Sequence, residues 1–240
     1  MNPISRFERK YILNLETYYR IRNAIVPFTQ RDFFSRKEGG TYLVRSIYYD
    51  TRDYRAWYEK EDGNFGRIKL RIRAYTDHKQ ECDRVSVELK TRQGNSMKKF
   101  SSFVDFSEYE HFVKTGSWLN YQDQTVCEFE RLRRVRQLVP VCLVQYRREG
   151  FTSLDRSPVR ITMDHNVVST RAATLFPDSP ILKPHRPKRV ILEIKTRGKE
   201  PPWLSGLVKQ QLLKLSANSK YWQGIEIIRP NMVTPRQVAP

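Results

Sequence analysis

The segment Phe65–Tyr75 alternates strictly between cationic and apolar residues. Its cations are Arg67, Lys69, Arg71 and Arg73. Successive side chains of a β-strand point to opposite faces, so this pattern predicts a strand with four positive charges on one face. Like charges two residues apart repel each other. The face is therefore either an outer surface that water screens or a surface that holds an anion.

The whole chain carries a large positive charge. Its 240 residues include 44 Lys and Arg against 26 Asp and Glu, a formal net charge of +18. Such a field indicates a polyanionic partner: nucleic acid, a phosphate-rich small molecule or an anionic membrane surface. Three cysteines without CxxC spacing predict neither a disulfide framework nor a zinc site. Without an apolar signal region or a membrane-length apolar run, the chain is expected to be soluble and cytoplasmic.

Hydrophobic periodicity predicts an α+β chain with strands and helices interspersed. Strands are expected at 4–14, 42–49, 65–75, 84–92, 97–106, 141–151, 158–168 and 189–197, the fourth and fifth joined by a turn at 93–95. Helices are expected at 15–27, 53–61, 107–117, 123–138 and 201–216, with a short one around Ser219 and Lys220. Residues 174–187 form a Pro-rich loop in this interpretation.

At least six of these strands carry ionisable residues in phase on one face and aliphatic residues on the other. In a sandwich the charged faces would point to water. The amphipathic helices, however, must also bury their apolar stripes. A barrel covered by helices would satisfy both needs and turn the charged faces inward. The four arginines of 123–138, at positions 131, 133, 134 and 136, are interpreted as a solvated helix face.

Ordered sequence blocks resemble a known family. The blocks are Arg6-x-Glu8-x-Lys10-Tyr11, Ser46-Ile-Tyr-Tyr-Asp-Thr51, Leu70-Arg-Ile-Arg73, Val87-Glu-Leu-Lys90, Tyr146-x-Arg148-x-x-Phe151, Val159-Arg-Ile-Thr-Met-Asp164, Leu192-Glu-Ile-Lys195, Glu200-Pro-Pro-x-Leu204 and Ser219-Lys220. Together they resemble the VTC domain, the polyphosphate polymerase module within the triphosphate tunnel metalloenzyme (CYTH-like) superfamily. The resemblance implies an antiparallel eight-stranded β-barrel tunnel with a basic lumen and helices packed outside. It implies one domain over 1–228, followed by a disordered tail over 229–240.

The resemblance also implies roles for individual residues. Those implied to be catalytic are Lys10, Arg71, Arg73, Lys90, Arg148 and Arg160. Those implied to bind phosphate are Lys98, Tyr146, Ser219 and Lys220. Glu193 resembles the carboxylate that holds Mn²⁺ or Mg²⁺ together with the phosphates. The alternative for each is a structural ion pair in the lumen, such as Glu88 with Arg71.

The resemblance implies that the protein is a polyphosphate polymerase that uses ATP and also binds triphosphate and inorganic polyphosphate. It implies no nucleic-acid partner, and a membrane-protein partner that is not part of this chain. Triphosphatase relatives carry an ExExK motif and further paired carboxylates. This chain has Arg6 in place of the first Glu, and Lys195 where a second Glu would follow Glu193. These departures favour transfer over hydrolysis. A triphosphatase, a cyclase of the same fold and a non-catalytic polyphosphate- or nucleic-acid-binding protein remain alternatives.

Overall fold

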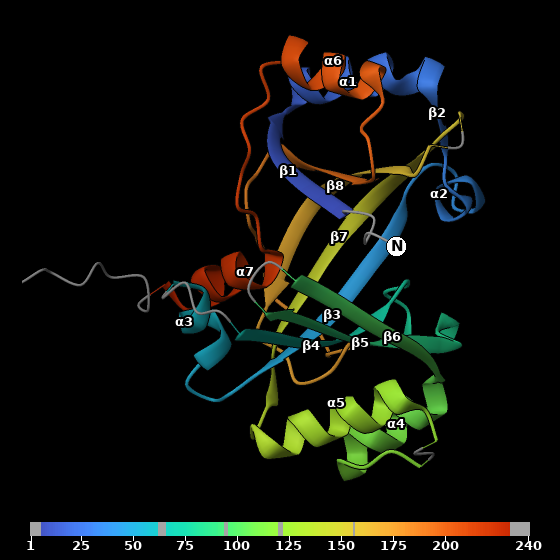
Figure 1. The fold of residues 1–240 in the computed structure, drawn as a ribbon. Helices are drawn as coiled ribbons and strands as arrows, with labels where there is room; N and C mark the ends of the chain where they lie inside the picture. Colours follow the sequence, from blue (N-terminus) through green and yellow to red (C-terminus); the bar gives the residue numbers. More distant parts are fainter. Residues whose placement is uncertain (1–5, 62–65, 94–95, 120–121, 156, 231–240) are drawn as a thin grey trace, which may run out of the picture. The chain divides into compact units, whose positions relative to one another are not determined.

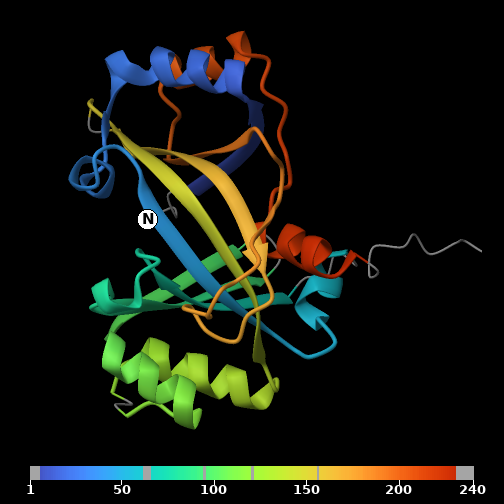
Figure 2. The ribbon, with the colours of Figure 1, turned by 180° about the vertical axis from the view of Figure 1, so that it is seen from behind.

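The computed structural model describes residues 6–61, 66–93, 96–119, 122–155 and 157–230, and the chain is α+β (Figures 1 and 2). The contacts divide it into two compact units. Unit 1 comprises Met1–Leu43, Tyr146–Val167 and Arg186–Ser219, and unit 2 comprises Val44–Gln145, Val168–His185 and Lys220–Pro240. Strands β3, β7 and β8 contribute residues to both units. No helix in the described ranges has the length and apolar character needed to cross a membrane.

Unit 1 is built on an antiparallel sheet in the order β1-β10-β8-β7, with β2 paired to β7. The strands are β1 (Arg6–Asn14), β2 (Thr29–Arg31), β7 (Val139–Ser153), β8 (Val159–Thr170) and β10 (Arg189–Arg197). The helices are α1 (Leu15–Ile25), the 3-10 turn η1 (Val26–Phe28), α2 (Phe33–Lys37) and α6 (Pro202–Gln210).

The two ends of helix α1 are explained by the residues at its boundaries. Asn14 caps it by accepting a hydrogen bond from the Thr17 backbone N–H at 2.7 Å, and Pro27 follows its last turn. Its apolar stripe, including Ile21 and Ile25, packs with Leu204 of α6 onto the sheet. Figure 1 shows α1 and α6 side by side beyond β1. The apolar parity of the unit 1 strands is therefore the parity that the helices cover.

Unit 2 repeats this arrangement with other elements. Its sheet order is β8-β7-β3-β4-β5-β6, and β9 pairs with β8. The additional strands are β3 (Tyr42–Asp50), β4 (Gly66–Ala74), β5 (Arg84–Gln93), β6 (Ser96–Asp105) and β9 (Lys183–Pro184). The helices are α3 (Arg55–Glu61), the 3-10 turn η2 (Lys79–Glu81), α4 (Phe106–Thr115), α5 (Gln124–Val135) and α7 (Lys220–Ile228).

The core of unit 2 lies between the sheet and helices α4 and α5. Leu70, Val87 and Leu89 pack there with Phe112 and Phe129, all of them buried. Gly116 ends α4 with a φ of 74°, a backbone conformation that glycine adopts without steric cost. In unit 2, as in unit 1, the helices cover the apolar parity and leave the charged parity on the other face.

The predicted fold class, an α+β chain with an antiparallel tunnel-like sheet and helices packed outside, is confirmed. The sheet of the described residues is not a closed barrel, because β1 and β6 are the two ends of its eight-strand order. All eight predicted strands exist, with ends within about two residues of the prediction. The helix predicted over 201–216 is wrong in length, because α6 ends at Gln210 and Leu212 has a positive φ of 47°. The short helix predicted around Ser219 begins at Lys220 and continues to Ile228. The centre of the predicted 93–95 turn and tail residues 231–240 lie outside the described residues, and the single-domain prediction stays untested.

Candidate functional site

Five cations gather on the charged face of the unit 2 sheet, which we call the basic face. In the strand register Lys69 lies opposite Lys90, and Lys90 lies opposite Lys99. Arg71 and Arg73 continue the same face of β4. Like charges directly opposite each other on adjacent strands destabilise a sheet. The lysine row therefore costs folding energy unless an anion offsets it.

One buried carboxylate, Glu88, lies among these cations. It contacts Arg71 at 2.6 Å, Lys99 at 3.2 Å and Arg73 at 3.4 Å. Burial alone would raise the pKa of Glu88, but the charges of Arg71, Arg73 and Lys99 outweigh it and hold the pKa far below its usual range. The structural ion pair between Glu88 and Arg71, which the sequence left as the alternative, is thus present. Glu88 pairs with three of these cations, and the register places a second carboxylate, Asp105, at the end of the same face opposite Arg84.

Of two adjacent lysines of β6, the one that was not predicted lies on the basic face. Lys98, predicted to bind phosphate, lies opposite Thr91 and shares its parity with the buried Val104, so it is not on the basic face. Its neighbour Lys99, which was not predicted, lies there instead. Counting outward from the predicted turn at 93–95 pairs residue 92 with 96 and therefore Lys90 with Lys98. The observed register, with Gln93 opposite Ser96, is shifted by one residue and pairs Lys90 with Lys99.

Arg71 and Arg73 are also held by neutral groups of β3. Arg71 donates a hydrogen bond from Nη1 to the Tyr48 hydroxyl at 3.0 Å, and Arg73 donates from Nε to Ser46 Oγ at 3.2 Å. The Tyr48 ring stacks on Tyr221 of α7, with ring centroids 5.3 Å apart. Tyr48 and Tyr221 are contributors that the sequence analysis missed, because no local pattern links residues so far apart.

The charged face of unit 1 is an alternating network, which we call the paired face. In the register Lys10 lies opposite Glu193 and Glu8 opposite Lys195. The Lys10 ammonium contacts Glu8 at 3.0 Å, and the Lys195 ammonium contacts Glu193 at 2.9 Å. Lys10 also donates a hydrogen bond to the carbonyl oxygen of Asn218 at 3.3 Å, a residue that was not predicted. Positive and negative side chains therefore alternate both along β1 and β10 and from one of these strands to the other.

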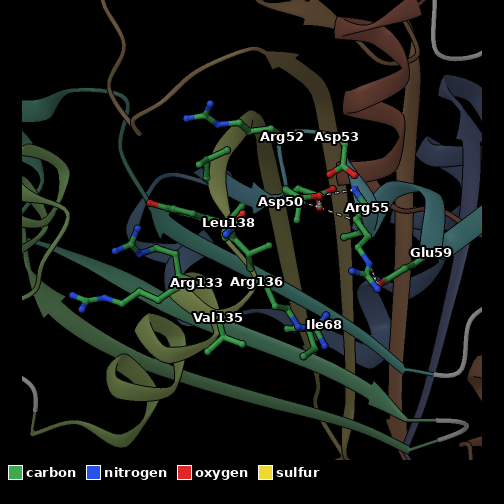
Figure 3. A pocket seen from close by; sticks show the side chains of 16 residues that line it. Asp50, Arg52, Asp53, Arg55, Glu59, Ile68, Arg133, Val135, Arg136 and Leu138 are labelled. Carbon is green, nitrogen blue, oxygen red and sulfur yellow. Dashed lines mark hydrogen bonds and ion pairs between the residues drawn. The ribbon is translucent and has the colours of Figure 1, made fainter.

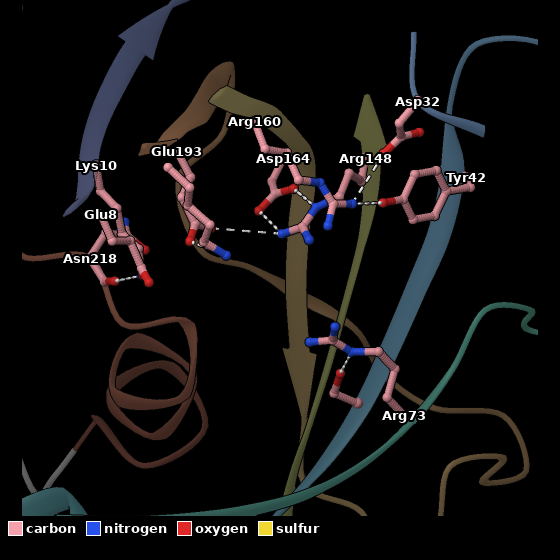
Figure 4. Close-up of polar contacts among 12 residues, drawn as sticks. Glu8, Lys10, Asp32, Tyr42, Arg73, Arg148, Arg160, Asp164, Glu193 and Asn218 are labelled. Carbon is pink, nitrogen blue, oxygen red and sulfur yellow. Dashed lines mark hydrogen bonds and ion pairs between the residues drawn. The ribbon is translucent and has the colours of Figure 1, made fainter. Parts of the chain in front are cut away.

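Arg148 completes this network (Figure 4). Its Nε and Nη2 donate to the two oxygens of Asp164 at 2.6 and 2.9 Å, a bidentate pair with a fully buried carboxylate. Its Nη2 lies 4.0 Å from Glu193, and its guanidinium stacks on the ring of Tyr146. Burial would lower the pKa of Arg148, but Asp164, Tyr146 and Glu193 raise it well above its ordinary value.

Arg160, also predicted to be catalytic, lies at the edge of the paired face. Its Nη2 is 3.1 Å from an oxygen of Asp32 and 3.5 Å from the Tyr42 hydroxyl, and its side chain is 46% exposed. Ser219 closes unit 1 in the sequence and Lys220 opens α7 in unit 2, both half-buried. The predicted residues are therefore distributed over the two units, and each unit holds its own cluster.

The groups around Glu193 bear on its predicted role as a metal ligand. The described residues contain no group of three or more His, Cys, Asp or Glu arranged to hold a metal ion. Glu193 is buried, and its oxygens face Lys195 and Arg148, with Glu8 the diagonal neighbour across β1 and β10. Mg²⁺ commonly binds through one or two carboxylates plus substrate phosphates. Glu193 and Glu8 are the carboxylates here that match this mode, and in this structure the oxygens of Glu193 lie against Lys195 and Arg148.

The chain resembles known proteins in fold and in sequence family. No curated protein matches the chain. A proposed adenylate cyclase from Bacillus halodurans has a similar structure, with 16% identity, a TM-score of 0.51 and coverage of 91% of this chain and 96% of that chain. A Pyrococcus horikoshii protein gives 16% identity and a TM-score of 0.48, with coverage of 92% and 99%. The VTC domain model matches residues 5–229. The chain therefore belongs to the VTC domain family, as the sequence blocks predicted.

Proposed function

We propose that this protein is a polyphosphate polymerase, which transfers the γ-phosphoryl group of ATP to the end of an inorganic polyphosphate chain. The observation that carries the proposal is the basic face of unit 2, where Arg71, Arg73 and Lys99 gather around one buried carboxylate and the register places Lys69, Lys90 and Lys99 in one row. A chain of phosphates is the kind of polyanion that such a row of cations attracts. The membership in the VTC domain family supports the same substrate class.

Phosphoryl transfer makes particular demands on a protein. Charge spreads over the transferred group and its bridging oxygens, so catalysis depends on positioning and on electrostatic stabilisation. Arginine forks bind two phosphate oxygens at once, and Arg73 is 7% exposed, so its charge is little screened by water. We assign Arg71, Arg73 and Lys90 to binding phosphate on the basic face, and we add Lys69 and Lys99.

The paired face supplies the second group of proposed ligands. Lys10, Arg148 and Arg160 bind phosphate oxygens in this proposal, with Tyr146, Ser219 and Lys220 in supporting roles. Glu193 holds Mn²⁺ or Mg²⁺, and Glu8 is the carboxylate nearest to it in the register. The metal, when bound, neutralises charge on the phosphates. Lys98 is the predicted ligand with the least support, because it lies on the helix-covered parity of β6.

Hydrolysis is the principal competing reaction. A triphosphatase needs carboxylates to hold metal ions and orient water, and Lys195 stands where another carboxylate would extend the Glu193 cluster. Acceptance of the phosphoryl group by a phosphate chain needs no such activated water. The arrangement of charges therefore favours transfer.

Product analysis tests the proposal. The purified protein is incubated with ATP and Mn²⁺, and the products are separated on a polyacrylamide gel and assayed for orthophosphate and cyclic AMP. Chains longer than triphosphate are the expected product. Orthophosphate alone would indicate a triphosphatase, cyclic AMP a cyclase, and no turnover a binding protein. Each of these three outcomes would contradict the polymerase assignment.

A further inference from the structure

A second basic site lies on unit 2, apart from the basic face. A pocket of about 1070 Å³ opens between the β3–α3 turn and the end of α5 (Figure 3). This volume is at the upper end of the range in which proteins bind small molecules. Five arginines line it, and they come from three separate places in the sequence: Arg52, Arg55, Arg133, Arg134 and Arg136. Its apolar floor includes Tyr49, Ile68 and Leu138.

Strand parity separates this pocket from the basic face. Ile68 of β4 lines the pocket, whereas Lys69 and Arg71 of the same strand have the opposite parity. Likewise Tyr49 lines the pocket, while Tyr48 contacts Arg71 on the other face. Residues that alternate along one strand point to opposite sides of the sheet. A ligand in the pocket therefore touches none of the proposed phosphate ligands of the basic face.

The arginines of the pocket differ in how far they are already neutralised. Arg133 and Arg134 both pair with the buried Glu130, at 2.7 and 2.5 Å, and Arg55 pairs with Glu59 at 3.4 Å. Arg52 and Arg136 are exposed and make no ion pair with any residue in the described part of the chain. The carboxylate of Asp50 is committed elsewhere, because it accepts hydrogen bonds from the backbone N–H of Thr51 and Ala56 and from Tyr221.

A helix-dipole role explains only some of these cations. Arg133 and Arg134 lie in the last turn of α5, where positive charge stabilises a helix. Arg52 belongs to the β3–α3 turn, and α3 is capped by Asp50 and Thr51, so the dipole of neither helix requires it. Arg52 and Arg136 thus add to the pocket lining two guanidinium groups that form no ion pair with a described residue. Such forks match the oxygens of phosphate groups.

We propose that this pocket binds a second oligophosphate anion, with Arg52 and Arg136 as its principal ligands and Arg55 and Arg134 as supporting ones. Its ligand is either inorganic triphosphate or the phosphate tail of a nucleotide, since the guanidinium groups recognise the chemistry that both share. The apolar floor under the arginines gives a nucleoside a surface to pack on. The proposal does not depend on the polymerase activity.

Calorimetric titration with inorganic triphosphate, and separately with ATP, tests the proposal. The key variant is Arg52→Ala/Arg136→Ala. The matched control is Arg20→Ala/Arg131→Ala, which also removes two exposed arginines and two charges, each from a helix surface outside the pocket. Arg71→Ala reports on the basic face. Wild type and control are expected to show two classes of site, and the key variant is expected to bind at the pocket at least tenfold more weakly.

The outcomes separate this proposal from the proposed function. A single class in wild type that only Arg52→Ala/Arg136→Ala removes would support the pocket and count against phosphate binding at the basic face. A single class that only Arg71→Ala removes, or a key variant that binds like its control, would overturn the pocket proposal. Tighter binding of ATP than of triphosphate at the pocket would identify a nucleotide as the ligand, and equal binding would identify the phosphates alone.

Discussion

The two units carry similar alternating sequences but handle charge in different ways. On the paired face of unit 1 four cations meet four carboxylates: Lys10, Lys195, Arg148 and Arg160 contact Glu8, Glu193, Asp164 and Asp32. On the basic face of unit 2 three cations, Arg71, Arg73 and Lys99, share Glu88. The paired face is stable as it stands. The basic face, by contrast, lowers its free energy when an anion arrives.

The comparison shows that alternation along a strand determines which face its charged side chains occupy, but not the net charge of that face. A strand such as β4 has no acidic residue on its charged parity, so its counter-charge comes from neighbouring strands, as where Glu88 of β5 pairs with Arg71 and Arg73. Strand β10 alternates Glu193 with Lys195 and therefore carries its own counter-charge. In the proposed function, the cations of the basic face bind phosphate and the carboxylates of the paired face hold the metal. The following predictions test this division, beginning with the largest effect.

Glu193→Gln is expected to lower chain elongation by at least about 100-fold while polyphosphate affinity stays equal or rises. A neutral amide is a poor ligand for a hard divalent ion, and loss of a negative charge favours a bound polyanion. Elongation and affinity are measured in one buffer with Mn²⁺. Glu200→Gln is the control, because Glu200 pairs with Arg9 on the other parity of β1. Loss of affinity in Glu193→Gln would show that Glu193 does not hold a metal.

Arg148→Ala and Arg71→Ala are expected to affect different properties. Without Arg148, the fully buried Asp164 loses its bidentate partner, so the free energy of unfolding should fall by about 3–5 kcal/mol. Without Arg71, Glu88 keeps Arg73 and Lys99, so stability should change by about 1 kcal/mol or less. The elongation rate of Arg71→Ala should nevertheless fall at least about tenfold.

Urea unfolding and elongation assays on both variants measure these effects, and Arg73→Ala provides a second test on the same face. Triphosphate should also raise the melting temperature of wild type more than that of Arg71→Ala. If Arg71→Ala unfolded as readily as Arg148→Ala, the basic face would be a structural ion-pair network like the paired face, and the comparison would fail.

Acid is expected to lower the stability of unit 1 by protonating Glu149, which lies on the apolar parity of β7. Burial alone would raise the pKa of this carboxylate, but hydrogen bonds with His165, Tyr18 and Arg22 outweigh it and lower the pKa to about 2. A carboxylate with a depressed folded-state pKa stabilises the protein above its unfolded pKa, which is near 4.5 here. That stabilisation is lost as the pH falls from about 4.5 to about 2.

Melting temperatures from pH 5 to pH 2.5 measure this effect. Glu149→Gln should be less stable than wild type at neutral pH, and the two curves should converge in acid. Tyr18→Phe, which leaves Arg22 and His165 in place, should reduce the pH dependence by a smaller amount. Parallel curves for wild type and Glu149→Gln would mean that other groups carry the acid sensitivity.

Two helix glycines give the smallest effects, one in each unit. A Cβ on Gly224 of α7 would lie 2.8 Å from Ser169 Oγ and 2.9 Å from Cys142 Sγ, whereas a Cβ on Gly206 of α6 meets nothing within 4 Å. Gly224→Ala should therefore lower the free energy of unfolding by about 1–3 kcal/mol. Gly206→Ala should raise it by about 0.5–1 kcal/mol through helix propensity. Opposite signs in urea unfolding are the expected result, and equal signs would contradict it.

The strands and their faces could be predicted from the sequence because alternation is a local signal. The end of α6 could not, because Gln210-Gln-Leu-Leu-Lys-Leu continues a helical pattern without glycine or proline to stop it. Two ion pairs, Arg148 with Asp164 and Arg71 with Glu88, join side chains on neighbouring strands. Predicting them requires the strand register as well as the alternation along each strand. Arg52 and Arg136 lie still further apart in sequence, and only the fold brings them to one pocket.

The division of the chain has a consequence for biosynthesis. Each unit is assembled from three separate stretches, and the stretches of the two units alternate along the sequence. Tyr221 of α7 donates a hydrogen bond to Asp50, 171 residues earlier, so unit 2 stays incomplete until Tyr221 has left the ribosome. Contacts of such long sequence separation slow folding. No single cut in the gene yields either unit alone, because the segments of the two units alternate along the sequence.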